Sequence, residues 1–255
     1  MLRALYADIG RLFKSKYFKV GMMAVPIIQM LYLLLIYLLM SLWLKESMKA
    51  EDVASWFSGT ALIWVAVVTL LMTERDFSDG CIRNKIISGV KRWEACLSAV
   101  LVGMLQGLMY SLMACLSFLA VSAVFFGGFT ELSPSEIAND WMVIILSCIA
   151  VGAFSTTLIM IFGGKKISYV LGLALAVGYP SFHSRVLEQL YPESGPCTLS
   201  GDKLAIYEFI DKYIPYSYLT TAPRHPMWVY WVGCTGLIIL SMLAGIGVFH
   251  KKELS

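Results

Sequence analysis

The sequence predicts an all-α integral membrane protein with six transmembrane helices, built as a single domain over residues 1–255. Of the 255 residues, 58% are hydrophobic and only 15% are charged, whereas soluble domains carry roughly 25% charged residues. Long uncharged apolar runs alternate with short charged segments, and about 20 apolar residues cross a bilayer as a helix. A soluble fold would expose more apolar surface than these few charges could cover. Burial in a bilayer removes that difficulty.

Residues 1–19 predict an amphipathic helix lying in the membrane interface. The segment has scattered charges and lacks the apolar core and cleavage site of a signal peptide. Its apolar residues recur at helical spacing. The charged residues that mostly separate them are Arg3, Asp8, Arg11, Lys14 and Lys16. The alternative is that 1–19 is only the basic flank of a first span. The apolar residues are Leu2, Leu5, Tyr6, Ile9, Leu12 and Phe13.

The apolar runs define the predicted spans. The third is too long for a perpendicular crossing, so we expect it to tilt or to extend beyond the bilayer. The fifth is short and contains Gly172, Gly178 and Pro180, so it is either a continuous span or a broken, re-entrant one. Gly103 and Gly107 form a GxxxG pair, which favours close helix packing within one subunit. The six spans are 20–44, 56–72, 95–126, 141–162, 167–182 and 227–249.

The positive charges predict the orientation of these spans. Five lysines and arginines precede the first span, five lie in the loop 73–94, two lie at 165–166 and two at 251–252, which is 14 of the 20. Cytoplasmic segments of membrane proteins carry such an excess. Both termini are therefore expected in the cytoplasm.

The predicted outer loop 183–226 is the only sizeable segment outside the spans. Val186, Leu187, Leu190 and Tyr191 form one amphipathic stretch, and 207–214 forms another. Between them, 192–202 is dense in Pro, Gly and Ser, which indicates a turn. We expect two short helices that rest on the outer leaflet or dip into it.

Enzymatic chemistry finds little support in the sequence. His183, His225 and His250 lie outside the spans and are expected to be solvated loop residues. Neither the histidines nor the six cysteines have the spacing of a metal site, and the cysteines suggest no disulfide framework. The net charge of +3 forms no concentrated basic stripe and gives no reason to expect a nucleic-acid partner.

The predicted spans contain no Asp, Glu, Lys, Arg or His, although ion-coupled transporters usually bind a coupling ion near the bilayer midplane. Energy for transport would therefore come from outside the membrane. The segment GGKK at 163–166 lacks the earlier glycine and the following Ser or Thr of a phosphate-binding loop. A separate ATPase is the simplest source of energy.

The segment 73–94, TERDFSDGCIRNKIISGVKRWE, resembles the loop after the second span in permeases of the ABC-2 type exporter family. Cys81 stands where threonine is common in that family. The C-terminal Phe249, Lys251, Lys252 and Glu253 also resemble the family's ending. The matching loop positions are Glu74, Asp79, Gly80, Ile82, Arg83, Asn84, Lys85, Ile86, Ile87, Gly89 and Arg92.

This resemblance implies that 73–94 forms a coupling helix docked on a cytoplasmic ABC ATPase subunit, which binds the ATP and magnesium; this chain would hold no cofactor. Arg83, Asn84 and Lys85 would face the ATPase, while Phe77 and two isoleucines, Ile82 and Ile86, hold the helix against the membrane domain. The alternative is that the basic residues only anchor the loop to lipid headgroups. A second permease copy or a related permease would complete the transporter.

The small size resembles permeases of bacterial peptide exporters, including those for lantibiotic protection and phenol-soluble modulins. This implies a bacterial plasma-membrane location and a hydrophobic or amphipathic cargo, best a peptide toxin or antimicrobial peptide. The alternatives are a lipid or small-drug exporter, an ion-coupled transporter, a membrane enzyme, and a membrane scaffold or sensor. Polarizable and aromatic residues within the spans are candidates to line the cargo pathway; the alternative, favoured for any single one, is that it faces lipid, a neighbouring helix or the interfacial aromatic belt. They are Tyr32, Tyr37, Trp64, Gln106 and Tyr110, with Met104 and Met109 nearby.

Overall fold

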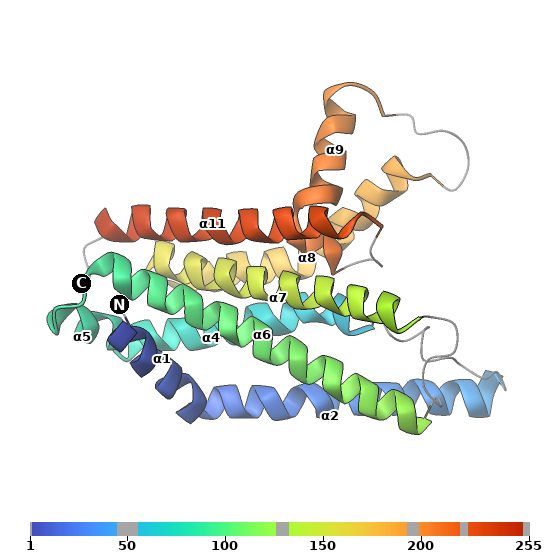
Figure 1. Ribbon diagram of the computed structural model, residues 1–255, viewed down its shortest axis with the longest axis horizontal. Coiled ribbons are helices and arrows are strands. Elements are labelled where there is room, and N and C mark those ends of the chain that lie inside the picture. The colour runs from blue at the N-terminus through green and yellow to red at the C-terminus, as the bar shows by residue number, and fades with distance from the viewer. Residues whose placement is uncertain (1, 45–55, 126–132, 193–198, 220–223, 252–255) are drawn as a thin grey trace.

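The computed structural model of the chain consists of helices and connecting segments (Figure 1). It describes residues 2–44, 56–125, 133–192, 199–219 and 224–251, and this part of the chain contains no β-strand. The predicted helical fold class is therefore confirmed. Part of the proline- and glycine-rich segment 192–202 lies outside the described residues, as do Lys252 and Glu253 of the C-terminal pattern.

The helices follow one another with short connections. A short amphipathic helix precedes the first long one, and a seven-residue helix separates the second long helix from the third. Two short helices precede the last long one. In chain order the elements are α1 Leu2–Lys14, α2 Lys16–Leu39 with the π-helical turn η1 Met40–Leu44, α4 Trp56–Ser78, α5 Cys81–Ile87, α6 Arg92–Phe125, α7 Pro134–Phe162, α8 Lys166–Leu190, α9 Asp202–Tyr213, α10 Pro215–Tyr218 and α11 Met227–Lys251.

Among the described residues, four helices are long and apolar enough to cross a membrane. They cover Lys16–Leu42, Arg92–Phe125, Pro134–Phe162 and Met227–Phe249. Within the protein, 67% of the most apolar part of α7 is buried, compared with 17% for α2. Hence α7 is the central helix and α2 is peripheral, with apolar side chains left on its outer face. Such a surface is that of a membrane protein.

Glycines allow α6 and α7 to pack with their backbones in close contact. A Cβ atom on Gly103 would lie 2.7 Å from the carbonyl oxygen of Gly152, and one on Gly107 would lie 2.7 Å from the carbonyl carbon of Cys148. Neither backbone could move aside without separating the helices. The expectation that the GxxxG pair serves packing within one subunit is confirmed.

The ends of α7 are set by local sequence signals. Ser133 and Glu136 form a capping box at its start, where Pro134 takes the first helical position. The helix ends at Gly163, whose φ of 66° is in the left-handed region that favours glycine. Helix α7 therefore begins seven residues before the predicted span 141–162.

The fifth predicted span is one continuous helix. Helix α8 runs from Lys166 to Leu190 through Pro180, so the broken or re-entrant alternative does not describe it. The stretch 186–191, predicted as a separate outer helix, forms the last turn of α8 and the residue after it. The second predicted outer helix is present as α9, which α10 follows directly.

The bundle has two distinct ends (Figure 1). Helix α5, the beginning of α1 and the C-terminal end of α11 lie at one of them. Helix α9 lies toward the other and projects steeply away from α11. Helix α6 crosses the bundle obliquely, as its length of 34 residues would require in a bilayer.

Candidate functional site

Helix α5 is a separate short helix because two glycines turn the chain at its ends. Gly80 has a φ of 68° and Gly89 a φ of 92°, conformations that cost side-chain-bearing residues energy. The amide of Asn84 donates to the carbonyl of Gly80 at 2.8 Å, which starts the helix. The bends expected at Gly80 and Gly89 are confirmed. They place α5 across the end of the bundle, between α4 and α6 (Figure 1).

The inner face of α5 is apolar and buried. Ile82 is 1% exposed and packs in a cluster with Phe249 of α11 and Cys96 of α6, against which Ile86 and Phe77 also pack. The rings of Phe77 and Phe249 meet edge to face with centroids 6.3 Å apart. The two segments that carry the family resemblance therefore touch each other, and the inner-face packing expected of Phe77, Ile82 and Ile86 is confirmed.

The outer face of α5 is exposed and mixed in character. Arg83 and Asn84 are exposed, and beside them Ile87 leaves 73% of its surface uncovered. A guanidinium, an amide and an isoleucine grouped on one rigid helix offer directed hydrogen bonds around an apolar contact. This combination is typical of a protein-binding surface.

The side chain of Lys85 is mostly buried, contrary to the expectation that it faces a partner. Its ammonium group pairs with the carboxylate of Asp8 at 2.6 Å, and its side chain is 14% exposed. The same carboxylate, 4% exposed, accepts from Ser98 of α6 and pairs with Arg11 at 3.2 Å. Lys85 thus fastens α5 to α1 inside the molecule.

Asp8 also changes the interpretation of the N-terminal helix. The face of α1 that packs on the body carries Ala4, Asp8 and Leu12, all buried. Tyr6 and Phe13, which belong to the predicted apolar face, are 83% and 45% exposed. Helix α1 therefore has one face held by α6 and another apolar face left free, and the second suits the membrane interface.

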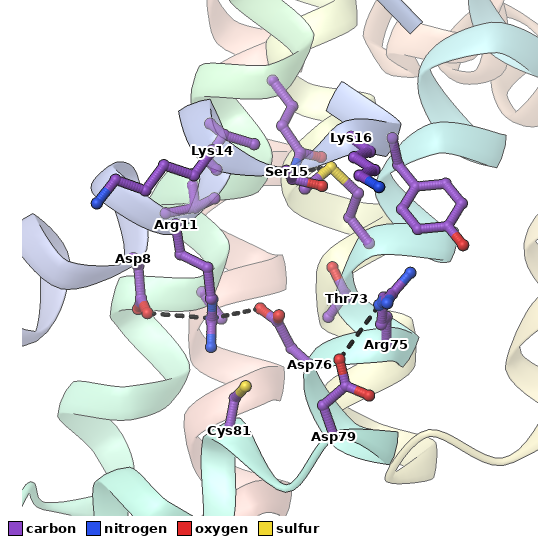
Figure 2. A pocket seen from close by; sticks show the side chains of 16 residues that line it. Asp8, Arg11, Lys14, Ser15, Lys16, Thr73, Arg75, Asp76, Asp79 and Cys81 are labelled. Carbon is purple, nitrogen blue, oxygen red and sulfur yellow. Dashed lines mark hydrogen bonds and ion pairs between the residues drawn. The ribbon is translucent and has the colours of Figure 1, made fainter. Parts of the chain in front are cut away.

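A second ion pair extends the charged cluster to α4. Arg11 donates to Asp76 at 2.6 Å while keeping its contact with Asp8 (Figure 2). Burial raises the pKa of Asp76 to about 6, against the opposing attraction of Arg11 and Lys85. Together, Asp8, Arg11, Asp76 and Lys85 connect α1, the end of α4 and α5, and we call them the Asp8 cluster.

The other charged loop positions singled out from the sequence differ in their exposure. Asp79 is exposed and pairs with Arg75 at 3.2 Å. Glu74 and Arg92 are half-buried. The structure thus divides the predicted coupling residues into an exposed set around Arg83 and a set engaged within the chain.

A cavity of about 580 Å³ opens beside the Asp8 cluster. Figure 2 shows that the α1–α2 junction, Lys14, Ser15 and Lys16, lies on one side, with Asp76, Asp79 and Cys81 on another. Its lining is Asp8, Arg11, Leu12, Lys14, Ser15, Lys16, Tyr17, Met72, Thr73, Arg75, Asp76, Asp79, Cys81, Ala99, Val102 and Gln106. Sequence reasoning missed this cavity, because it depends on contacts between α1 and segments about 65 to 90 residues away.

The predicted pathway residues lie in several different packing environments. Gln106 alone among them lines the cavity. Tyr110 is fully buried against Phe18 and Gly21, Trp64 packs on the same core, and Tyr37 is 38% exposed with its ring against Phe125. Tyr32 is partly buried in another cluster, and Met104 and Met109 pack on two separate cores. These residues are mainly packing residues of the helices.

The histidines of the predicted outer loop are not solvated, contrary to expectation. His183 is fully buried, and its Nε2 lies 3.2 Å from one oxygen of Asp211, while the Nε2 of His225 lies 2.9 Å from the other. Tyr191 donates to the same carboxylate at 3.4 Å. A buried carboxylate needs such partners, so these residues join α8, α9 and the segment that precedes α11. The side chain of His250 lies outside the described residues.

Burial acts to raise the pKa of Asp211, but hydrogen bonds from His183 and His225 outweigh it and hold that pKa below its usual range. Within the described ranges, no group of three or more His, Cys, Asp and Glu side chains has the arrangement of a metal site.

Comparisons with known proteins give no match to this chain. A scan against models of protein families finds no match to this chain, and a search of curated proteins finds no similar sequence.

Proposed function

We propose that this chain is the membrane-spanning permease subunit of an ABC exporter, moving a hydrophobic or amphipathic cargo with ATP hydrolysed by a separate subunit. The proposal rests on the two faces of α5. Its inner face is buried on the membrane domain, and its outer face presents Arg83, Asn84 and Ile87. Such a helix supplies a firm surface through which a partner's movement reaches the bundle.

The Asp8 cluster supports a coupling role for α5. A force on α5 would pass through Lys85 to Asp8 on α1, and from there through Arg11 to Asp76 on α4. Ile82 and Phe249 connect the same helix to α11. A helix that only anchored the loop to lipid would not need contacts to α1, α6 and α11.

The proposal includes six spans, with α4 and α8 added to the four membrane-length helices. Both pack on α7 within the bundle. An even number of spans agrees with α1 and the end of α11 lying together (Figure 1), and the excess of Lys and Arg at that end favours a cytoplasmic location. The proposed membrane is the bacterial plasma membrane that the family resemblance implies.

Thiol labelling of intact cells tests this topology. In a variant with Cys197→Ala, a cysteine replacing exposed Ser200 should react with an impermeant reagent, and one replacing exposed Ser88 should react only after the membrane is opened. Labelling of position 88 from outside would overturn the six-span arrangement.

Co-purification tests the exporter function. The tagged chain, isolated from host membranes in mild detergent, should bring with it an ATPase, whereas the chain stripped of that partner should hydrolyse no ATP. The charge reversal Arg83→Glu should lower ATPase recovery about ten-fold, because an interfacial charge contact becomes repulsive. The matched control is Lys166→Glu, an exposed residue at the start of α8. Equal recovery from both variants and wild type would refute docking through α5.

Transport by proteoliposomes containing the complex separates an exporter from a scaffold or sensor. ATP should drive accumulation of an amphipathic peptide, with a lipid and a small drug as parallel cargoes. ATP turnover with no movement of any of them would favour the scaffold.

A further inference from the structure

Helix α9 runs across the direction of the long helices instead of along it. It leaves the bundle toward the end opposite α5 and is steeply inclined to α11 (Figure 1). Because α11 is long and apolar enough to cross a membrane, a helix at such an inclination to it extends along the plane of the bilayer. The orientation of α9 is therefore that of a helix on a membrane surface.

The end of α9 lies at the depth where α11 begins. A Cβ atom on Gly233 of α11 would lie 2.7 Å from the carbonyl oxygen of Tyr213, the last residue of α9. The distance along the helix from Met227, where α11 begins, to Gly233 is about 9 Å. Trp228 and Trp231, in this same stretch of α11, are 59% and 49% exposed. Exposed tryptophans near the end of a spanning helix are typical of the boundary between lipid and water.

One side of α9 is held by the rest of the protein. Asp211 is buried, and its two carboxylate oxygens lie 3.2 Å from the Nε2 of His183 and 2.9 Å from the Nε2 of His225. We call these three residues the Asp211 clamp. The clamp joins α9 to α8 and to the segment before α11, so it fixes which side of α9 faces outward. Phe182 of α8, next to His183, is also exposed and adds an aromatic ring at this level.

The free side of α9 divides into an apolar strip and a polar strip. The apolar strip consists of Ile206 and Phe209, which are 55% and 58% exposed, and the helical repeat places both of them opposite Asp211. In the polar strip beside it, Lys212 pairs with Glu208 at 2.6 Å, and both side chains are partly exposed. A free surface that is apolar along one strip and charged along the next suits a boundary between lipid and water.

We propose that α9 binds the lipid leaflet at the end of the bundle opposite α5, with the apolar strip inserted among the acyl chains and the polar strip in water. The Asp211 clamp keeps the apolar strip turned toward the lipid. Helix α9 thus rests on the leaflet with two side chains inserted and does not dip into it as a whole. The inference requires only that the chain spans a membrane, and it does not depend on the exporter function.

Fluorescence quenching in vesicles tests this orientation. An environment-sensitive fluorescent amino acid replaces Ile206, Phe209 or, as the matched control on the polar strip, Glu208. The full chain is reconstituted into phosphatidylcholine vesicles, with iodide on both sides. Acyl chains brominated near the headgroup quench from within the leaflet, whereas iodide quenches from water. Bromine should quench positions 206 and 209 about three-fold more than position 208, and iodide should show the reverse order.

Polar substitutions measure the contribution of the apolar strip. Ile206→Gln with Phe209→Gln should speed amide hydrogen exchange across α9 about ten-fold in vesicles, since local opening no longer withdraws apolar side chains from lipid. The control Glu208→Gln breaks the exposed pair with Lys212 and should change exchange by less than about two-fold. Asp211→Ala should lower the bromine preference of positions 206 and 209 about two-fold, because the clamp no longer fixes α9. Thermal unfolding verifies that every variant is folded.

Four results would overturn the proposal. Iodide quenching of positions 206 and 209 as strong as at position 208 would place the apolar strip in water. Equal bromine quenching at all three positions would show that α9 is submerged as a whole. Protection of 206 and 209 from both quenchers would show a contact with protein, such as a second copy of this chain. An added amphipathic helical peptide that removes the bromine quenching at 206 and 209 would show a peptide site.

Discussion

Removing the charge of Asp8 should release α1 from the helix bundle. In the variant Asp8→Asn the side chain keeps its size but loses its negative charge. Lys85, only 14% exposed, then loses the ion pair at 2.6 Å, while Arg11 keeps Asp76 as a partner. The effect should therefore concentrate on the α1–α5 contact.

The expected loss follows from the burial of this contact. Hydrogen bonds to charged groups contribute about 1.5–3 kcal/mol, and removing one member of a fully buried ion pair costs about 3–5 kcal/mol. Arg11 is 35% exposed and retains a partner, so most of the loss comes from Lys85. We expect Asp8→Asn to lower the free energy of unfolding by about 2–4 kcal/mol.

Denaturant unfolding in mild detergent measures this loss, and hydrogen exchange of α1 locates it. In the double-mutant cycle with Lys85→Met, the coupling energy should be at least about 1 kcal/mol. The control is Asp79→Asn, which breaks an exposed pair with Arg75 and should cost no more than about 1 kcal/mol. Additive effects of Asp8→Asn and Lys85→Met, with unchanged exchange of α1, would refute this assignment.

Three further variants test other parts of the structure by unfolding measurements. Gly107→Leu should lower the free energy of unfolding by about 3 kcal/mol or more, because the added side chain would force α6 away from Cys148 of α7. The control Gly178→Leu should lower it little, because an added Cβ at that position meets nothing within 4 Å. Similar losses from the two variants would contradict the close packing. Because burial raises the pKa of Asp76 to about 6, wild-type stability should fall as pH rises from about 4 to 6, and Asp76→Asn should lack this slope. Above pH 6, Asp76→Asn should be more stable than the wild type by less than about 3 kcal/mol, since the carboxylate is 32% exposed. A variant less stable than the wild type above pH 6 would contradict the raised pKa of Asp76. Asp211→Asn should lower stability by about 1–3 kcal/mol at neutral pH, through weaker hydrogen bonds to His183 and His225. The pKa of Asp211 lies below its usual range, so the wild type should lose this advantage as the pH falls through 3.8 and below; an advantage that persists there would contradict the assignment.

Local signals in the sequence were sufficient for much of the fold. Uncharged apolar runs located the long helices, and Gly80 and Gly89 located the bends around α5. The GxxxG pair indicated a close helix contact, although only the structure identifies Gly152 as its partner. Each of these inferences depends on residues close together in the chain.

The charged clusters could not be predicted, because their members are distant in sequence. In the sequence, Asp8 is one of the charged residues between the apolar positions of 1–19, and nothing local distinguishes it from an exposed aspartate. Its partner Lys85 lies 77 residues away. His183 and Asp211 are separated by 28 residues, and periodicity could not show that α9 brings them together.

Site-specific photo-crosslinking in intact host cells tests most directly whether the outer face of α5 docks an ATPase. A photoreactive amino acid is placed at Arg83 or Ile87, which are exposed on that face, and at Lys166 as an exposed position at the start of α8. We predict that positions 83 and 87 yield an adduct containing an ABC ATPase, identified by its peptides, and that position 166 yields little. Adducts with lipid alone at 83 and 87, or ATPase adducts equally strong at 166, would contradict docking through α5.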